Sequence, residues 1–543
     1  MKRQRAGIRY RLMLLCFLIQ PFKGFSADPA PLAFVEDQTY PCSRYDVIDI
    51  EFTADAGESD PFSVQFGALF TGPDDIELDI PGFYNGGESF LLRFSPPEPG
   101  SWTFETHSSL AALAGKKGRV RGGKKSGPGR HGPLTVMEGN PRHFRYSGGA
   151  PCFVLAYEAD WLFALDAGND RGIPKTGTLV GQIAAHGFNQ IVMNVYAYDV
   201  SWDKDPDLKA EHEFGPPGIY PFLGTNQSPD FSALNVDFFK HFDRVIRLLD
   251  TKGITAHIMI YVWNKRVSWP DMHSGADNLY FDYVVSRYQA FSNVIWDISK
   301  EALAYGRCDM EYINERILRL RRLDAYGRLL TVHDYAYCSA YPEHVDFISV
   351  QSWRSGLYHH MRSIAQRHPD RPVYNIEHGG YEKGPYDVFR GDYSDPEICL
   401  TRNYQCVFAG AYSTYYWQCS SWNVVIHDPL SLPEGERPRF DYYRHLSNLF
   451  SRFDFSALQP SVSYSSSGYA LSNDRDLFLF LIQGENDYIH VHLPNDIDKQ
   501  MSVTWFNPFS GEYRAVGSVT LRDWHEFSSP WGNGMAVLIL EGK

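Results

Sequence analysis

Two glutamates of the sequence stand at the ends of short apolar runs. Glu301 follows the run NVIWDI and a Ser-Lys pair, and Glu377 closes the run in RPVYNIE. β-branched and aromatic residues fill both runs, as is typical of parallel strands buried on both faces. Two carboxylates at the ends of different strands can flank a glycosidic bond, where one protonates the leaving oxygen and the other attacks the anomeric carbon. We therefore take Glu301 and Glu377 as a candidate catalytic pair, with Glu301 as a catalytic acid.

These glutamates need a scaffold that brings strand ends together, and residues 139–452 carry the pattern of one. Eight apolar runs alternate there with helical patterns, at residues 152–157, 190–195, 255–261, 293–298, 329–333, 347–351, 373–377 and 413–417. Such alternation predicts parallel βαβ units and, with eight of them, an α/β fold of the (β/α)8 TIM barrel type. Active sites of that fold lie at the C-terminal ends of the strands, where Glu301 would follow the fourth and Glu377 the seventh. A doubly wound open sheet is the alternative arrangement of the same units.

Helical patterns between the runs support this scaffold. After Asn235 an apolar stripe recurs at helical spacing, and the pattern stops at Gly253. Residues 309–324 alternate charged and aliphatic side chains, as an outer helix of a barrel would. Before the fourth run, Asp277 is a candidate N-cap for a helix that includes residues 280–288.

Two β-rich parts flank the predicted barrel. Residues 27–138 contain alternating runs and a strand-turn-strand segment at 81–106, which predict an Ig-like β-sandwich. Residues 453–543 contain four short apolar runs separated by turn residues, which predict a small C-terminal β-sandwich. Within the first part, residues 110–131 are rich in glycine, lysine and arginine. We expect an exposed loop insertion there; the alternative is a contact for an anionic polysaccharide.

The first 26 residues predict a secretory signal peptide, so we expect the protein to be secreted or periplasmic. Five basic residues precede an apolar stretch at 12–18 that is too short to span a bilayer, and Gly24-Phe25-Ser26 is a small-x-small cleavage site. No other segment predicts a membrane span. Removal of this peptide would take the net charge from −14 to −20, because it holds six basic and no acidic residues. So acidic a chain argues against nucleic acid as a partner. The sequence does not specify the oligomeric state.

The cysteines predict neither a disulfide scaffold nor a zinc site. Seven of the eight remain after removal of residues 1–26, and they are scattered without a CxxC pair. No histidine spacing predicts a catalytic metal. We therefore expect neither a metal nor a cofactor.

Several stretches carry a resemblance to a known group of enzymes. In the first part this is PGFYNGGESFLLRFSPPEPGSWTFET, and in the barrel it is YFDYVVSRYQAFSNVIWDISKE and RPVYNIEHGGYEKG. The chain resembles clan A retaining glycoside hydrolases, and more closely those in which an Ig-like sandwich precedes an apiosidase-like or cellulase-like barrel. SVTWFNPFSGEY and SSPWGNGMAVLILEG are similar to the domain, named for collagen binding, that often ends such proteins. The resemblance implies hydrolysis of a poly- or oligosaccharide, with a glutamate acid/base after strand four and a glutamate nucleophile after strand seven.

Lys300 departs from the pattern of this clan, whose members usually carry asparagine directly before the acid/base. A lysine charge close to Glu301 would lower the pKa of that carboxyl and weaken it as an acid. The charge could instead meet a carboxylate or sulfate of the substrate. The competing hypothesis is therefore a non-catalytic glycan-binding protein on a degenerate glycosidase barrel.

Other polar and aromatic residues at the predicted strand ends are candidates for substrate binding. Aromatic residues make up 15% of the chain, and their faces can stack on the C–H faces of sugar rings. The candidates are Tyr157, Trp161, Tyr196, Trp263, Lys300, His333, Gln351, Trp353, His378, Tyr381 and Trp417. The resemblance makes Trp417 the main candidate platform, since the clan commonly has an aromatic residue there. Glu158 and Glu382 are the alternative carboxylates.

Overall fold

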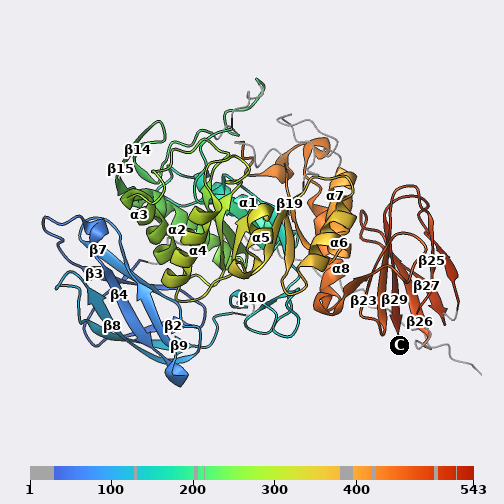
Figure 1. The fold of residues 1–543 in the computed structure, drawn as a ribbon, viewed down its shortest axis with the longest axis horizontal. Helices are drawn as coiled ribbons and strands as arrows, with labels where there is room; N and C mark the ends of the chain where they lie inside the picture. Colours follow the sequence, from blue (N-terminus) through green and yellow to red (C-terminus); the bar gives the residue numbers. More distant parts are fainter. Residues whose placement is uncertain are drawn as a thin grey trace, which may run out of the picture.

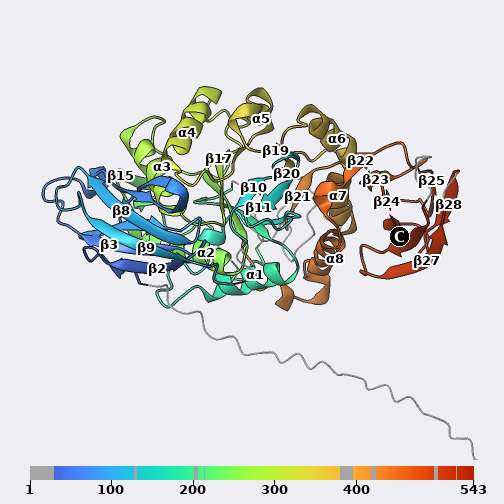
Figure 2. The same cartoon turned by 90° about the horizontal axis from the view of Figure 1, so that it is seen from below.

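The computed structural model describes residues 30–542 except 128–130, 201–205, 213–214, 379–395, 418–423, 494–498 and 521–522. Figures 1 and 2 show three parts in a row: a β-rich N-terminal part, a central α/β part and a β-rich C-terminal part. The central part is the predicted barrel, which is thereby confirmed, together with the β-rich parts that flank it. Among the described residues, no helix combines the length and the apolar composition that a membrane crossing requires.

Eight parallel strands form the wall of the barrel. Their order is β18-β17-β16-β13-β12-β21-β20-β19. They are β12 (Leu155–Glu158), β13 (Gln190–Asn194), β16 (Thr255–Val262), β17 (Val294–Lys300), β18 (Leu330–His333), β19 (Ile348–Gln351), β20 (Val373–Glu377) and β21 (Tyr412–Tyr415). The end strands of this order meet, because the amide of Asp346 donates to the Leu330 carbonyl at 2.8 Å and Thr331 Oγ1 donates to Ser349 Oγ at 3.1 Å. All eight strands overlap the runs predicted from the sequence.

Eight described α-helices accompany these strands. They are α1 (Pro174–Ala185), α2 (Val236–Thr251), α3 (Gly275–Tyr288), α4 (Met310–Leu323), α5 (Tyr335–Ala340), α6 (Leu357–Arg367), α7 (Pro396–Phe408) and α8 (Phe440–Ser451). Asn235 caps α2, whose predicted apolar stripe is buried. The predicted cap of α3 is wrong: Ser274 accepts from the Asp277 amide at 3.2 Å, one turn earlier. The Asp277 carboxylate is buried and instead accepts from the hydroxyl groups of Tyr261 and Tyr312.

Two sheets form the N-terminal sandwich around one apolar core. One is β1 (Leu32–Ala33), β3 (Ile48–Thr53), β7 (Ser89–Phe94) and β6 (Phe83–Tyr84); the other is β2 (Thr39–Ser43), β9 (Lys117–Gly123), β8 (Gly100–Ser108), β4 (Phe66–Thr71) and β5 (Glu77–Pro81). The basic segment is therefore not only a loop. Lys117, Arg119 and Arg121 alternate with buried residues along β9, which pairs with β2 and β8. Glycines at 118 and 122 hid this alternation from the sequence pattern.

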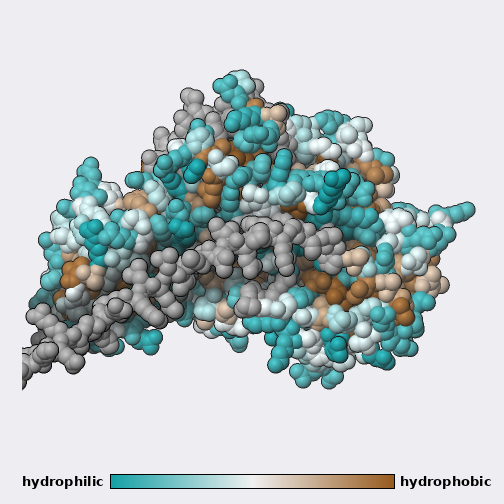
Figure 3. Space-filling view, turned by 180° about the vertical axis from the view of Figure 1, so that it is seen from behind, coloured by the Kyte–Doolittle hydropathy of each residue, from teal (hydrophilic) through white to brown (hydrophobic). Residues whose placement is uncertain are grey.

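The C-terminal part contains a six-stranded and a two-stranded sheet that share an apolar core. The first is β22 (Gln459–Ser461), β23 (Tyr469–Ser472), β24 (Leu477–Ile482), β29 (Ala536–Gly542), β26 (Met501–Phe506) and β27 (Tyr513–Val519); the second is β25 (Tyr488–Val491) and β28 (His525–Ser528). Two further pairs, β10 (Leu134–Val136) with β11 (Phe144–Tyr146) and β14 (Phe222–Thr225) with β15 (Ser228–Leu234), lie outside these sheets. Seen from the side opposite to Figure 1, hydrophobic residues form small separate groups on a mostly polar described surface (Figure 3).

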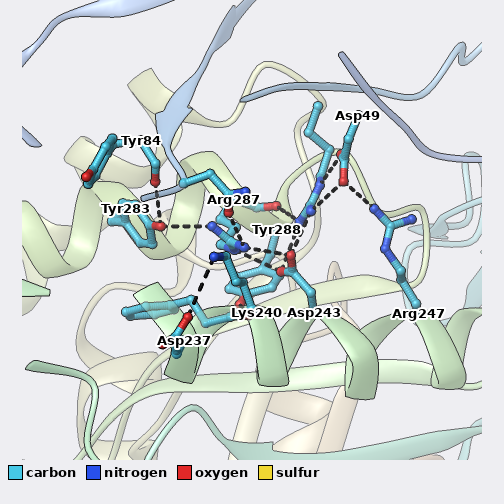
Figure 4. A network of polar contacts seen from close by, with 12 residues as sticks. Asp49, Tyr84, Asp237, Lys240, Asp243, Arg247, Tyr283, Arg287 and Tyr288 are labelled. Carbon is cyan, nitrogen blue, oxygen red and sulfur yellow. Dashed lines mark hydrogen bonds and ion pairs between the residues drawn. The ribbon is translucent and has the colours of Figure 1, made fainter. Parts of the chain in front are cut away.

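A buried network of ion pairs joins the N-terminal sandwich to the barrel (Figure 4). Arg93 of β7 lies between Asp49 of β3, at 2.7 Å, and Asp243 of α2, at 2.8 Å. Arg247 of α2 contacts Asp49 at 2.6 Å, and Arg287 of α3 contacts Asp243 at 2.8 Å. Arg93 is 1% exposed. Every charge in this network has a partner of opposite sign, so the charges can be buried together. Replacement of one guanidinium would leave its carboxylate partners buried without a counter-charge, which is strongly destabilising.

We predict that Arg93→Met destabilises the protein by about 3–5 kcal/mol, because Asp49 and Asp243 each lose a buried charge partner. The measurement is the apparent midpoint of urea unfolding followed by tryptophan fluorescence. Lys117→Met is the matched control, since its ion pair with Glu105 is exposed and is expected to contribute less than about 1 kcal/mol. Equal midpoints for the two variants would contradict the structural role of the network.

Candidate active site

The C-terminal ends of the barrel strands bring a set of polar side chains together. Glu158, His333, Gln351 and Glu377 are the last residues of β12, β18, β19 and β20, and Glu301 directly follows β17. Because the strands are parallel, these residues lie around one mouth of the barrel.

Glu301 is held by neutral donors and by an unusual backbone. Gln351 Nε2 donates to Glu301 Oε1 at 2.6 Å, and Asn264 Nδ2 donates to Glu301 Oε2. The residue has a φ of 56°, in the left-handed region, which costs a side chain of this kind about 1 kcal/mol. Such strain concentrates at functional positions, where the surrounding structure fixes it. The residue is 9% exposed.

Lys300 lies at the centre of a buried cluster of carboxylates. Its ammonium nitrogen is 2.5 Å from Glu158 Oε1, 3.2 Å from Asp160 Oδ2 and 3.3 Å from Glu377 Oε2. Lys265 adds a second cation, 3.4 Å from Asp160 Oδ2. Lys300 and Lys265 are each 1% exposed. The charge that the sequence places next to Glu301 is therefore taken up by three other carboxylates.

Burial and the neighbouring charges set the protonation of Glu377. Burial raises the pKa of this carboxyl, Lys300 lowers it, and Glu301 raises it further; together with smaller contributions the pKa rises to about 7. A shift of this size at a mouth of polar residues marks a candidate functional group. Glu377 thus changes charge near neutral pH.

The remaining groups of the cluster divide between charged and neutral forms. Burial raises the pKa of Glu158 well above its usual value, and the opposing charge of Lys300 does not offset it. Burial alone would also raise the pKa of Asp160, but Lys300 and Lys265 lower it below its usual value. Burial and the charge of Lys300 hold the pKa of His333 well below its usual range, so this imidazole is neutral. Its Nε2 lies 3.9 Å from Glu377 Oε2.

Several of the predicted substrate-binding residues lie in this region. The ring of Trp161 lies under the Lys265 ammonium group, 5.2 Å from its centroid. Trp353 lines an open pocket together with Gln351. Trp263 is half-buried and stacks on Tyr261 with ring centroids 5.8 Å apart.

Three other residues predicted to bind substrate are buried, and their role stays a prediction. Tyr157 packs against Phe188, Tyr415 and Phe440, in the layer between the strands and α8. Tyr196 packs against Phe163, Tyr220 and Phe238. His378 is fully buried, and its carbonyl accepts from Arg402 Nε at 2.9 Å. Tyr157 and Glu158 point to opposite faces of the sheet because successive side chains of a strand alternate.

The remaining predicted residues are Trp417, Tyr381 and Glu382. Trp417 is buried just beyond β21, whereas Tyr381 and Glu382 lie outside the described residues.

The structure adds three residues that the sequence reading missed. Asp160 and Lys265 complete the charged cluster, although each lies beyond its strand end by a few residues. Tyr305 is 59% exposed, and its amide donates to the Glu301 carbonyl at 3.2 Å. Burial and the charges of Glu301 and Glu377 raise the pKa of Tyr305. Of these three residues, only Asp160 had a signal in the sequence, because in YEAD it stands two positions after the candidate carboxylate Glu158.

A (β/α)8 barrel with several buried carboxylates at the C-terminal mouth of its strands is the architecture of many glycoside hydrolases. A family model of the apiosidase-like catalytic domain matches residues 138–435, more than half of the chain, and the chain belongs to this family. The resemblance noted from the sequence is thereby confirmed. A domain of unknown function matches residues 41–109. The protein is a glycoside hydrolase, and its substrate is a carbohydrate.

Solved structures support the fold. A putative glycoside hydrolase from Bacteroides vulgatus ATCC 8482 is 18% identical with a TM-score of 0.75, over 93% of this chain and 100% of that one. A glycoside hydrolase of family 5 from the same organism is 17% identical with a TM-score of 0.58, over 76% of this chain and 94% of that one. No curated protein matches the chain.

Proposed function

We propose that the protein cleaves a glycosidic bond by retaining double displacement, with Glu377 as the nucleophile and Glu301 as the acid/base. The observation that supports this assignment is the difference in the partners of the two carboxylates. Glu377 lies 3.3 Å from the Lys300 ammonium group, whereas Glu301 accepts from the neutral amides of Asn264 and Gln351. The Lys300 cation favours the ionised form of Glu377 that a nucleophile needs, and it opposes the burial that raises the pKa of this carboxyl.

The chemical steps follow from these roles. Glu377 attacks the anomeric carbon while Glu301 gives its proton to the leaving oxygen, so that the glycosidic bond breaks and a glycosyl ester forms on Glu377. Glu301, now ionised, takes a proton from water as that water attacks the same carbon. The ester bond breaks, and the sugar is released with its original anomeric configuration. Trp161, Trp263, Trp353 and Trp417 are proposed to contact the sugar rings.

The competing hypothesis is a glycan-binding protein without turnover. The observation that favours it is the contact of Lys300 with Glu377, since an ion pair with the proposed nucleophile reduces its negative charge and its reactivity. Binding of a glycan without release of product, unchanged in Glu377→Gln, would support it.

We predict that Glu301→Gln lowers kcat/KM by about 10²–10⁴-fold, the usual contribution of a general acid/base, and Glu377→Gln by at least as much. The measurement is product release from plant, algal and host polysaccharides, with apiose-containing glycans first because of the family that the barrel matches. Glu311→Gln on the outer helix α4 is the matched control and is expected to leave the rate unchanged.

Two further readouts separate the roles. Glu301→Gln should retain more activity on aryl glycosides whose leaving group needs no proton, whereas Glu377→Gln should not. Mass spectrometry of a slow reaction should find the sugar attached to the peptide that holds Glu377. Full activity of Glu377→Gln would refute this nucleophile and point to Glu158 or Glu382.

We also predict a defined pH dependence. Glu377, with its pKa raised to about 7, must be ionised to attack, so kcat/KM should rise with pH through about 7. Lys300 lowers this pKa, and Lys300→Met should therefore move the acidic limb of the profile to higher pH. Lys300→Arg, which keeps the charge, is the control. The pH at the midpoint of this limb does not depend on the fraction of the enzyme that is folded. An acidic limb of Lys300→Met at the same pH as that of the wild type would contradict the proposal.

We propose that the chain is exported and that residues 1–26 are removed as a signal peptide. The support is the basic, apolar and small-residue pattern of that segment. Intact-mass measurement of the protein recovered from periplasm and culture medium should give a chain that begins at residue 27. Recovery of the full chain from the cytoplasm alone would contradict this proposal.

A further inference from the structure

A cavity at the junction of the barrel and the C-terminal part collects three arginines. Arg142 lies in the turn before β11, Arg362 on α6 and Arg475 in the turn between β23 and β24, and all three line this cavity. We call it the arginine cavity. Figures 1 and 2 show the C-terminal sheet beside α6, α7 and α8, where these segments meet. Residues far apart in the sequence thus direct positive charge to one place.

The charge of the arginine cavity has no counterpart in its lining. Among the described residues, no aspartate or glutamate lines it, and none of the three arginines forms an ion pair with a described carboxylate. Arg362 Nη2 donates to the Pro460 carbonyl at 3.3 Å, but its Nε is buried and meets no acceptor in the described part of the chain. Burial and the charge of Arg142 lower the pKa of Arg362, as expected of guanidinium groups that crowd one another.

The titratable groups nearest to the cavity form no described ion pair with its three arginines, although the carboxylate of Asp476 accepts from the lining residue Asn473 at 2.7 Å. His143 lines it, but burial and the charge of Arg142 lower the pKa of this imidazole to about 4, so it is neutral at pH 7. Asp474 accepts from Gln459, Tyr464 and Ser472. Asp454 accepts from the amide and the hydroxyl group of Ser456. Both carboxylates are thus engaged by neutral donors of their own neighbourhoods.

We propose that the arginine cavity binds an oxyanion group, a carboxylate, sulfate or phosphate. The planar guanidinium presents paired N–H donors whose spacing matches two oxygens of such a group. Arg142 and Arg362 come from the barrel part and Arg475 from the C-terminal part, so a bound oxyanion links the two. A direct contact already joins them, the stacked rings of Tyr358 and Tyr469 with centroids 3.6 Å apart. The source of the oxyanion is either a free inorganic ion or a charged sugar of an acidic glycan.

The test measures binding to the full chain after removal of the signal peptide, by calorimetry and by the midpoint of thermal unfolding. The probes are sodium sulfate, sodium phosphate and sodium glucuronate, each compared with sodium chloride at the same ionic strength. We expect saturable binding and a rise in the midpoint beyond that in chloride. Arg142→Gln with Arg475→Gln, both at exposed positions, should weaken binding by roughly ten-fold or more, because charge-assisted hydrogen bonds are lost. Arg514→Gln, an exposed arginine paired with Glu512, is the control and should change nothing.

The possible outcomes distinguish a free inorganic ion from a charged sugar, and each of these from the absence of a specific site. Binding of sulfate and phosphate without glucuronate would identify a site for a free inorganic ion. Tighter binding of glucuronate, with oligosaccharides of uronic acids tighter still, would identify a charged sugar. Effects that equal those of chloride, or that persist in the double variant, would refute the site. Hydrolysis by Glu377→Gln bears on none of these outcomes, so failure of the proposed mechanism and failure of this inference are distinguishable.

Discussion

The contact of the Lys300 ammonium group with three buried carboxylates is the interaction on which the polar interior of the barrel depends. Carboxylates excluded from water are tolerated only where cations and donors meet them. Lys300 meets Glu158, Asp160 and Glu377 from a single point at the end of β17. Glu301, the next residue, has a left-handed backbone, and its carboxylate receives amide donors from Gln351 and Asn264. Adjacent residues of one strand end thus serve two electrostatic environments.

The scaffold around this mouth is fixed from its outer surface. The N-terminal sandwich contacts α2 and α3 through Arg93, and the C-terminal part contacts α6 through the Tyr358–Tyr469 stack. Both attachments described here are made to outer helices. The flanking parts therefore restrain the helices that press on the strands, and the strand ends remain available to side chains and substrate.

Most of the fold could be predicted from the sequence, because each barrel strand is a compact apolar run followed by a turn signal. Which strand side chains point into the barrel and which point to the helices was harder to predict. A strand buried on both faces shows no polar alternation, so nothing in the sequence told Tyr157, which faces the helices, from Glu158, which faces the interior. The strand β9 was missed because glycines occupy its inward positions 118 and 122.

The candidate site was predictable only in part for a related reason. Glu301 and Glu377 could be named because strand ends are visible in the sequence. The carboxylates that Lys300 contacts are set by how three strands come together around the barrel axis. That arrangement leaves no pattern in the local sequence. Lys265 and Asp160 follow their strands by several residues and join the cluster only through tertiary structure.

The ion network at Arg93 has a consequence for how such a chain can change over generations. Asp49 and Arg93 belong to the sandwich, whereas Asp243, Arg247 and Arg287 belong to the barrel. A substitution on either side leaves a buried charge on the other, so a compensating change must arise in a different part of the chain. Recombination that exchanged the sandwich for one from a distant relative would break this match of charges. The sandwich and the barrel are therefore expected to be inherited as one unit.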